Sequence, residues 1–197
     1  MKLCIDLCAG LGGFSQAFRD DPENWEVITV ELNKKQRPTI CADVRYLPLK
    51  ENLQPDLLLM SPPCQRWSIA NPNWPLKGIK IACEIVGACL ESVATLKPKR
   101  WIMENPRGRL RWIIGNPKHT IRYSDYDFNY PLQKATDFWG NVNLPMVKGI
   151  RRPPVGHLPK GWFRPKIGNR QLFPKQADRA KVPLGVSLAV KEGAETT

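Results

Sequence analysis

The residue with the most evident chemistry is Cys64, in the segment Ser61-Pro62-Pro63-Cys64-Gln65. The segment follows the apolar run 57–60, which has no polar position and therefore predicts a parallel strand buried on both faces. Because proline fixes φ and restricts the residue before it, the two prolines hold the thiol on a stiff loop at the end of that strand. A cysteine presented in this way is a candidate nucleophile.

A glycine loop near the start of the chain is the second chemical segment. The β-type run Lys2 to Leu7, which contains Asp6, passes through Cys8-Ala9-Gly10-Leu11-Gly12-Gly13 into a helical pattern from Phe14 to Phe18. Strand, glycine turn and helix place backbone N–H groups and a helix N-terminus at the carboxyl edge of a sheet, where a cofactor can bind. Taken alone, the same residues can equally form nothing more than a tight turn.

Acidic residues follow two further predicted strands. The run Trp25 to Val30 ends in Glu31, where a carboxylate can accept hydrogen bonds from both hydroxyls of a ribose. A solvated strand end is the alternative for a single glutamate. A third short run, Thr39 to Cys41, leads to Asp43, which can accept from an adenine amino group.

A carboxylate is also predicted beside the thiol. The strand Lys99 to Met103 runs into Glu104-Asn105-Pro106 and can neighbour the strand that precedes Cys64. Parallel strands meet at one edge of a sheet by their carboxyl ends, so the two side chains are expected at the same edge. In isolation, the tripeptide is more simply a strand-to-turn junction.

The elements that must position these residues alternate between strands and helices. This alternation, with glycine and proline turns at strand ends, predicts an α/β three-layer domain around a mostly parallel sheet. The remaining predicted elements are a core helix over 77–96, a basic helix or turn over 107–114, an exposed tyrosine-rich strand over 120–128, a last helix over 182–191 and a frayed tail over 192–197.

Composition bounds the class of protein. The chain has 197 residues, 42% of them hydrophobic, which predicts one soluble globular domain. No apolar run approaches the roughly 20 residues of a membrane helix, and the first residues enter a strand pattern without a signal-peptide core, so we expect a cytoplasmic protein and no membrane partner. The six cysteines form no CxxC pair. We therefore expect no zinc site, and we interpret the five besides Cys64 as small buried hydrophobes.

The net charge of +12 is unevenly spread. Residues 1–96 carry 10 Lys or Arg against 11 Asp or Glu, whereas residues 97–197 carry 20 against 7. Such asymmetry indicates a polyanionic partner, most commonly a nucleic acid, with a solvated basic surface as the alternative.

The stretch 148–177 has eight basic and no acidic residues among prolines and aromatics. Such a stretch can follow a phosphate backbone and stack bases, or it can be a disordered linker.

Together, the segment 6–14, Glu31, the segment 61–65 and Glu104-Asn105-Pro106 resemble the cytosine-carbon-5 DNA methyltransferases, which use S-adenosylmethionine. The Pro-Pro-Cys-Gln element is the most specific of the four. The resemblance covers roughly the first 110 residues, and the segment from Tyr123 through Trp139 looks like that of short, often phage-encoded members. It implies a Rossmann-like fold and a cytosine flipped out of duplex DNA, in a bacterial, archaeal or virus-infected host cell.

The resemblance also implies a role for each matching residue. Cys64 would add to carbon 6 of cytosine, and Glu104 would donate to or protonate ring nitrogen 3. Arg66 and Arg122 are candidates for the positive field that favours the thiolate, and Arg122 is our candidate for the contact with the 2-oxo group. The implied cofactor contacts are Asp6, Cys8, Ala9, Gly10, Gly12, Gly13, Phe14, Glu31, Leu32, Asp43, Val44 and Pro62. The implied nucleic-acid contacts are Gln65, Arg66, Ser68, Asn105, Arg151 and Arg152, and no metal is implied.

This sequence also departs from the family pattern. Cys8 stands where an aromatic residue usually packs against the adenine, Pro106 replaces a more common valine, and a Gln-x-Arg-x-Arg segment is absent. The chain has no room for a large target-recognition domain. We therefore predict a catalytic domain over 1–142, a reduced target-recognition region over 143–181, and a C-terminal helix and tail over 182–197 that return to the catalytic domain.

Three alternatives to a DNA methyltransferase stay open at this point. The same chemistry can act on RNA, since a related branch of the family modifies transfer RNA. A non-catalytic binding or regulatory subunit is another possibility, although it has no physical need for both Cys64 and Glu104. An enzyme that acts on a free pyrimidine nucleotide would need less positive charge than the second half of the chain carries.

Overall fold

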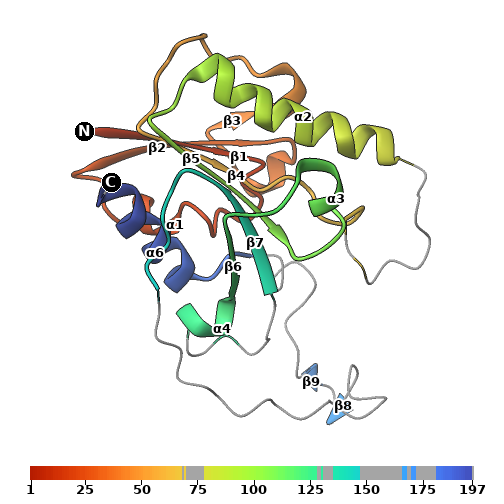
Figure 1. Cartoon of the computed structure of the whole chain (residues 1–197). Helices are drawn as coiled ribbons and strands as arrows, with labels where there is room; N and C mark the ends of the chain where they lie inside the picture. The colour runs from red at the N-terminus through yellow and green to blue at the C-terminus, as the bar shows by residue number, and fades with distance from the viewer. Residues whose placement is uncertain are drawn as a thin grey trace.

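The computed structural model describes residues 1–67, 69, 78–127, 130, 135–146, 166–167, 170–171 and 181–196. Its centre is a seven-stranded sheet in the order β3-β2-β1-β4-β5-β7-β6 (Figure 1). In that sheet, β7 pairs antiparallel with β5 and β6, and the other pairs are parallel. The strands are β1 (Lys2–Leu7), β2 (Trp25–Glu31), β3 (Ile40–Cys41), β4 (Leu57–Met60), β5 (Arg100–Pro106), β6 (His119–Arg122) and β7 (Ala135–Gly140). The predicted α/β class with a mostly parallel sheet is confirmed.

Helices cover both faces of the sheet. The long helix α2 lies over one face, and α1, α4 and α6 gather on the other (Figure 1). Outside the main sheet, β8 (Lys166–Ile167) and β9 (Arg170–Gln171) pair with each other antiparallel. The helices are α1 (Gln16–Arg19), α2 (Ile79–Leu96), α3 (Arg111–Ile114), α4 (Tyr123–Tyr126) and α6 (Leu184–Glu195), with 3-10 turns η1 (Lys34–Gln36) and η2 (Val44–Tyr46).

Alternate strand residues pack against the two helical layers, as the period of a β-strand requires. On β5, Ile102 belongs to the core cluster beneath α1, α4 and α6, and Met103 belongs to the cluster beneath α2. All four residues of β4 are fully buried because both faces of this central strand are covered. This explains why the run before Cys64 contains no polar residue.

The end of the chain packs on its beginning through buried polar contacts. Ser187 Oγ on α6 donates to the backbone oxygen of Phe14 at 2.7 Å and accepts from the backbone N–H of Ala17 at 3.0 Å. The glycine loop meets the segment just before α6, because a Cβ on Gly13 would lie 2.4 Å from the backbone oxygen of Val182. Segments about 170 residues apart therefore fix each other's position.

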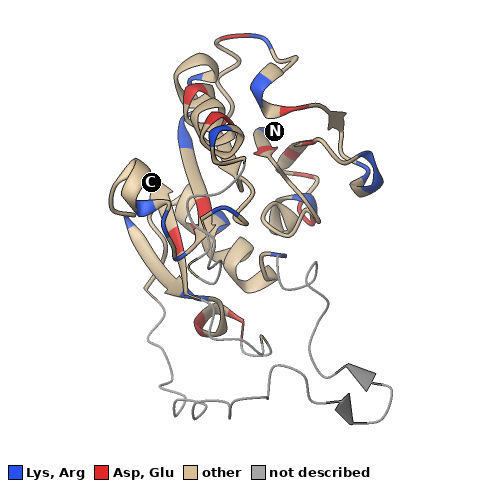
Figure 2. Ribbon diagram, turned by 90° about the vertical axis from the view of Figure 1, so that its right-hand side faces the viewer, with Lys and Arg blue, Asp and Glu red and all other residues tan. Residues whose placement is uncertain are grey.

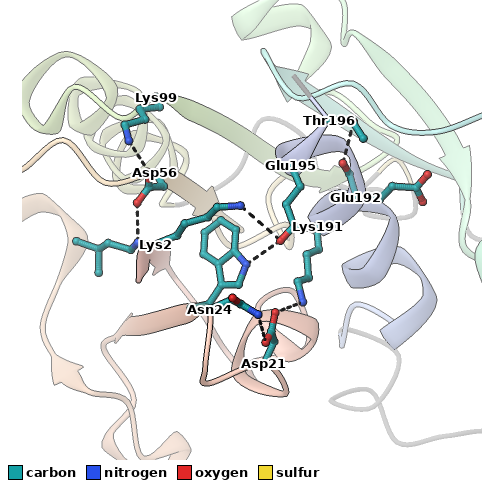
Figure 3. Close-up of polar contacts among 11 residues, drawn as sticks. Lys2, Asp21, Asn24, Asp56, Lys99, Lys191, Glu192, Glu195 and Thr196 are labelled. Carbon is teal, nitrogen blue, oxygen red and sulfur yellow. Dashed lines mark hydrogen bonds and ion pairs between the residues drawn. The ribbon is translucent and has the colours of Figure 1, made fainter.

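Charged side chains add to the same junction (Figure 3). Lys191 Nζ on α6 lies 2.6 Å from a carboxylate oxygen of Asp21, just after α1. Glu195 accepts from the indole N–H of Trp25 at 3.0 Å, and Lys2 Nζ lies 3.8 Å from the same carboxylate. The last turns of α6 are thus tied to the first two strands.

Three sequence predictions about local structure are wrong. The exposed strand predicted over 120–128 is not present over the described residues 120–127, because the strand ends at Arg122 and Tyr123 begins a short helix with its side chain fully buried. The tail does not fray from residue 192, because α6 continues to Glu195, which is held by Trp25. Cys41 is not buried, because it lies on the short edge strand β3 and is exposed.

Two smaller differences concern helix bounds and the cysteines. The helix predicted over 14–18 is the single turn Gln16–Arg19. Cys4 and Cys89 are buried, Cys8 and Cys83 are partly buried, and all six cysteines, which lie in the described ranges, are free thiols.

Charged residues of both signs are spread over the described helices and strands (Figure 2). The basic stretch 148–177 lies outside the described residues except for β8 and β9. Within the described part, no helix combines the length and apolar character needed to cross a bilayer, and no three His, Cys, Asp or Glu residues group as metal ligands.

Candidate active site

A cavity of about 330 Å³ opens at the carboxyl ends of the central strands. We call it the central cavity. The glycine loop, residues 8–13, forms one wall, and the Cys64 loop, residues 61–65, forms another. Both Cys64 and Glu104 line it. Of the predicted cofactor and nucleic-acid contacts, it also contains Cys8, Ala9, Gly10, Gly13, Phe14, Glu31, Pro62 and Gln65.

Two smaller cavities adjoin the central one. A cavity of about 200 Å³, here called the apolar cavity, is lined by the predicted contacts Leu32, Asp43 and Val44 together with Ile81 and Ile85 of α2. Another, of about 300 Å³, extends along the outer side of the glycine loop and includes Gly12, Arg19 and Arg37. Glu31 belongs to the wall of all three cavities.

The carboxylate of Glu31 is held at the end of β2 by backbone donors. It accepts from the N–H of Gly10 at 3.0 Å and from the N–H of Asn33 at 2.9 Å. Gly10 has φ of +52°, a conformation that favours glycine, and a Cβ there would come no nearer than 4.0 Å to the oxygen of Cys8. The loop therefore presents bare backbone to open space beside an acceptor for hydroxyl groups.

Hydrogen bonds from backbone N–H groups and from a side-chain amide fix the Cys64 loop in place. Asn105 Nδ2, fully buried, donates to the backbone oxygen of Pro62 at 2.8 Å, and the N–H of Ser61 donates to the oxygen of Leu7 at 3.0 Å. The N–H of the buried Trp67 donates to the oxygen of Cys64 at 2.9 Å. The sulfur is thus carried by a loop whose backbone is bonded to the neighbouring strands.

Glu104 enters the central cavity from within β5 and not from a turn after it. Its side chain is 6% exposed, and Tyr123 donates its phenol hydrogen to Glu104 Oε1 at 2.7 Å. Burial raises the pKa of the Tyr123 hydroxyl well above its usual value, and the neighbouring charge of Glu104 raises it further. Tyr123 is therefore a neutral hydrogen-bond donor throughout the ordinary pH range.

Asp6 lies behind the glycine loop and is not part of the walls of the three cavities. It is fully buried and accepts from Ser15 Oγ at 2.6 Å, and Ser15 in turn accepts from Arg19 Nη1 at 2.8 Å. Arg19 Nη2 donates to the oxygen of Gly12 at 2.6 Å. Burial raises the pKa of Asp6 to about 7, so this carboxyl group can carry a proton near neutrality.

Asp43 lines the apolar cavity, but its carboxylate is engaged within the protein. Arg45 lies 2.7 Å from Asp43 Oδ2 and also bonds Glu84 at 3.0 Å. The hydrogen bonds from Arg45 lower the pKa of Asp43. The backbone N–H of Arg45 also bonds the same carboxylate, so Asp43 fixes the turn η2 at the cavity wall.

Some predicted site residues are not brought to the central cavity. Arg122 is exposed at the end of β6 and is not among the described residues of that wall. The guanidinium of Arg66 lies beside Gly78, at the start of α2. Asn105 supports the Cys64 loop from below through its bond to Pro62. Ser68, Arg151 and Arg152 lie outside the described residues.

Sequence reasoning missed several residues of this site, among them Asn33 and Gln36 in the cavity wall. Lys181 and Val182 line the central cavity next to Gly13, although they lie far away in the sequence. The prediction that the end of the chain returns to the catalytic domain was the only signal for them. Tyr123 was missed because its surroundings resemble an exposed strand.

A thiol and a carboxyl group facing one cavity can attack and protonate the same planar ring. The glycine loop and Glu31 add a surface suited to a nucleoside cofactor. This sheet order, with one antiparallel strand and these groups at the carboxyl edge, defines a Rossmann-like methyltransferase fold. Residues 3–138 match the family of C-5 cytosine-specific DNA methylases. The chain belongs to this family.

Individual relatives are distant. The chain is 29% identical, over 157 residues that cover 70% of each protein, to a probable DNA (cytosine-5)-methyltransferase of Frog virus 3 (isolate Goorha). Among solved structures, it is similar to a putative DNA modification methyltransferase encoded within a prophage of E. coli, with a TM-score of 0.50, 17% identity and coverage of 74% and 49% of the two chains. It also matches the Dnmt2 methyltransferase of S. pombe, with a TM-score of 0.48, 19% identity and coverage of 71% and 50%. The chain spans about half the length of these two solved proteins.

Proposed function

We propose that this protein methylates carbon 5 of cytosine in DNA, with S-adenosylmethionine as methyl donor and with a covalent adduct between Cys64 and carbon 6 of the base. The observation that carries the proposal is that Cys64 and Glu104 line one cavity together with the glycine loop and Glu31. Family membership supports cytosine as the target. The name of the Frog virus 3 relative supports DNA.

The residues present fit S-adenosylmethionine. Glu31 would bind the ribose hydroxyls. Two backbone N–H groups hold its carboxylate at the meeting point of the cavities, where it is positioned to accept further hydrogen bonds. The apolar cavity beside it, with Leu32 and Val44, suits an adenine ring. Lys181 offers a positive charge for a carboxylate at the edge of the glycine loop. When bound, the cofactor supplies an electrophilic methyl group on a sulfonium centre.

Cys64 would act as the nucleophile of the reaction. Its thiolate adds to carbon 6 of the cytosine, forming a C–S bond while the ring π electrons move to carbon 5. Carbon 5 would then take the methyl group, with cleavage of the bond between that group and the donor sulfur, which would leave as a neutral thioether. A base or water removes the proton from carbon 5, the double bond forms again, and the C–S bond breaks to return the thiolate. Covalent addition thus divides one difficult step into easier ones.

Glu104 would supply the proton that makes the addition possible. As the thiolate attacks, negative charge develops on ring nitrogen 3, and a carboxyl proton directed at that nitrogen stabilises it. A carboxyl group that is 6% exposed is suited to holding a proton, since burial disfavours the charged form. After elimination, the proton can return to Glu104.

We propose that the basic region within 143–181 contacts the nucleic-acid backbone. Changing both Arg151 and Arg152 to Gln should then lower the slope of log affinity against log salt by about one for each phosphate that the protein no longer neutralises. The slope is measured by titrating a labelled duplex at several salt concentrations. An unchanged slope excludes a phosphate role for these two residues.

The test of the proposed activity is transfer of labelled methyl groups from S-adenosylmethionine. Duplex DNA, single-stranded DNA and transfer RNA are offered in parallel. We expect Cys64→Ala to retain less than about a thousandth of the activity, because the covalent route is removed. The matched control is Cys41→Ala, which removes an exposed thiol on β3 and should leave activity unchanged.

A trapping experiment tests the adduct itself. A duplex with 5-fluorocytosine at the target cannot lose a proton from carbon 5, so the C–S bond should persist and the protein should migrate with the DNA in a denaturing gel. Activity in Cys64→Ala, or a trapped complex formed by it, contradicts the mechanism. Labelling of transfer RNA alone would favour the RNA alternative, and binding without any methyl transfer would favour a non-catalytic subunit.

A further inference from the structure

Tyr123 reaches Glu104 from an element that does not line the central cavity. It is the first residue of α4, directly after β6, and β7 lies between β6 and β5 in the sheet. Its hydroxyl lies 2.7 Å from Glu104 Oε1, and both side chains are buried. Glu104 and Ile102 are two positions apart on β5, so they face the same helical layer as Tyr123.

The ring of Tyr123 is held firmly. It is fully buried in the core cluster shared by α1, α4 and α6. The ring of Tyr130 meets it edge-on, with centroids 5.3 Å apart and an interplanar angle of 77°. A phenol packed on all sides cannot follow a moving carboxylate, so it dictates where the carboxylate lies.

We propose that Tyr123 is the positioning residue of Glu104: its hydroxyl holds Oε1 in place and directs the proton that the target cytosine receives to Oε2. This inference rests on the proposed function. A carboxylic acid carries its proton on one oxygen, and the oxygen that already accepts from a phenol is the less favourable place for it. Tyr123 thus selects the oxygen that is protonated without itself touching the base.

The choice of a phenol has a chemical reason. A guanidinium at this place would stabilise the carboxylate so strongly that Glu104 could not hold a proton. A neutral donor fixes the geometry without placing a full positive charge beside the carboxyl group. Other titratable groups on the elements around Glu104 include Cys64, Lys181, Glu31, Tyr130, Asp125 and Asp137, the last of these paired with Arg111.

The first test compares two variants of the same helix. Tyr123→Phe removes the hydroxyl that bonds Glu104, and Tyr126→Phe removes the hydroxyl that bonds the backbone oxygen of Pro145 at 2.8 Å. Each variant loses one phenol hydrogen bond from α4. We expect single-turnover methyl transfer to fall about 10- to 100-fold in Tyr123→Phe, as for a lost bond to a charged group, with DNA affinity unchanged. Tyr126→Phe should keep the wild-type rate.

The pH profile of the methyl-transfer rate distinguishes a positioning role for Tyr123 from a purely structural one, which would leave the profile unchanged. The phenol stabilises the carboxylate form of Glu104, so its removal raises the carboxyl pKa. The limb of the rate profile that reports loss of this proton should therefore shift to higher pH in Tyr123→Phe and stay in place in Tyr126→Phe. Equal rates and profiles in the two variants would overturn the inference while leaving the proposed function standing.

A second measurement does not depend on activity. Carboxyl-¹³C-labelled glutamate allows NMR titration of Glu104, with Glu104→Gln to assign its signal. We expect the pKa of Glu104 to be higher in Tyr123→Phe than in the wild type and unchanged in Tyr126→Phe. If the wild-type protein transfers no methyl group, the proposed function fails, and this titration alone decides whether Tyr123 controls the carboxyl. An unchanged pKa contradicts the inference.

Discussion

The neighbouring strands β5 and β7 each carry a buried acid, and the two acids are held in different ways. Asp137 on β7 is 0% exposed, and Arg111 donates to its two oxygens through Nε and Nη2, with Thr120 as a further donor at 2.8 Å. Glu104 on β5 accepts from the neutral hydroxyl of Tyr123. In the register, Asp137 lies opposite Asn105, so the two acids occupy neighbouring positions.

The difference separates a structural acid from one suited to proton transfer. The hydrogen bonds that Arg111 donates to Asp137 raise the pKa of Arg111, so this guanidinium stays charged. A carboxyl group held by a phenol or hydroxyl can take up and release a proton. Asp6 is held by Ser15 in the same neutral manner, behind the glycine loop. The acid that lines the central cavity thus has a neutral donor, whereas neither Arg111 nor Asp137 is among the residues that line this cavity.

The largest expected effect comes from breaking the ionic pair. Arg111→Met leaves Asp137 buried without its cation, and the free energy of unfolding should fall by about 3–5 kcal/mol. Urea denaturation measures the loss. Arg107→Met, which removes an exposed arginine a few residues earlier, should change stability by no more than about 0.5 kcal/mol.

A double variant sharpens this result. Adding Asp137→Leu to Arg111→Met removes the stranded charge, so part of the lost stability should return. A double variant as unstable as the single one would mean that packing, and not charge, is what Arg111 provides.

The second effect is a pH dependence at Asp6. Its pKa is about 7 in the folded protein and 3.8 as the reference value, so between about pH 4 and pH 7 the folded state keeps a proton that the unfolded state has lost. Stability from this group is therefore fully present below pH 4 and declines as the pH rises to 7, by up to about 4 kcal/mol. Asp6→Asn should remove the decline, as unfolding experiments at pH 4.5 to 8 can show.

Asp43 provides a comparison of opposite sign. Hydrogen bonds from Arg45 lower its pKa, so its contribution is present above the unfolded pKa and disappears as the pH falls through the folded one. The free energy of unfolding should therefore fall most at neutral pH in Asp43→Asn, and it should change little in acid. If the change in the free energy of unfolding caused by each substitution varies with pH in the same direction for both variants, the opposite pKa shifts of Asp6 and Asp43 are contradicted.

The meeting of Cys64, Glu31 and the glycine loop could be predicted from sequence because each follows or ends a strand of one parallel sheet. Carboxyl ends of parallel strands share an edge, so chain order alone brings these residues together. The strand before Cys64 could also be predicted, because burial on both faces excludes polar residues. These predictions needed only local patterns and one topological rule.

The contacts that cross the fold could not be predicted in this way. The bond from Tyr123 to Glu104 depends on β7 inserting between β5 and β6, which no local pattern encodes. The approach of Val182 to the glycine loop requires that Gly13 lack a side chain, but a glycine in a turn looks the same in sequence. Arg122 was assigned by resemblance, and its exposure at a strand end depends on where the next helix begins.

The smallest expected effect tests whether a neutral donor also holds the end of the chain in place. Ser187→Ala strips the backbone oxygen of Phe14 and the N–H of Ala17 of a buried partner, so the free energy of unfolding should fall by about 1–2 kcal/mol. Leu188→Ala, at an exposed position of the same helix, should change it by less than about 0.5 kcal/mol. Because α6 follows the segment that lines the central cavity beside Gly13, Ser187→Ala should also weaken S-adenosylmethionine binding in calorimetry, and Leu188→Ala should not. Loss of stability with unchanged cofactor affinity would show that the end of the chain supports the core but not the cavity.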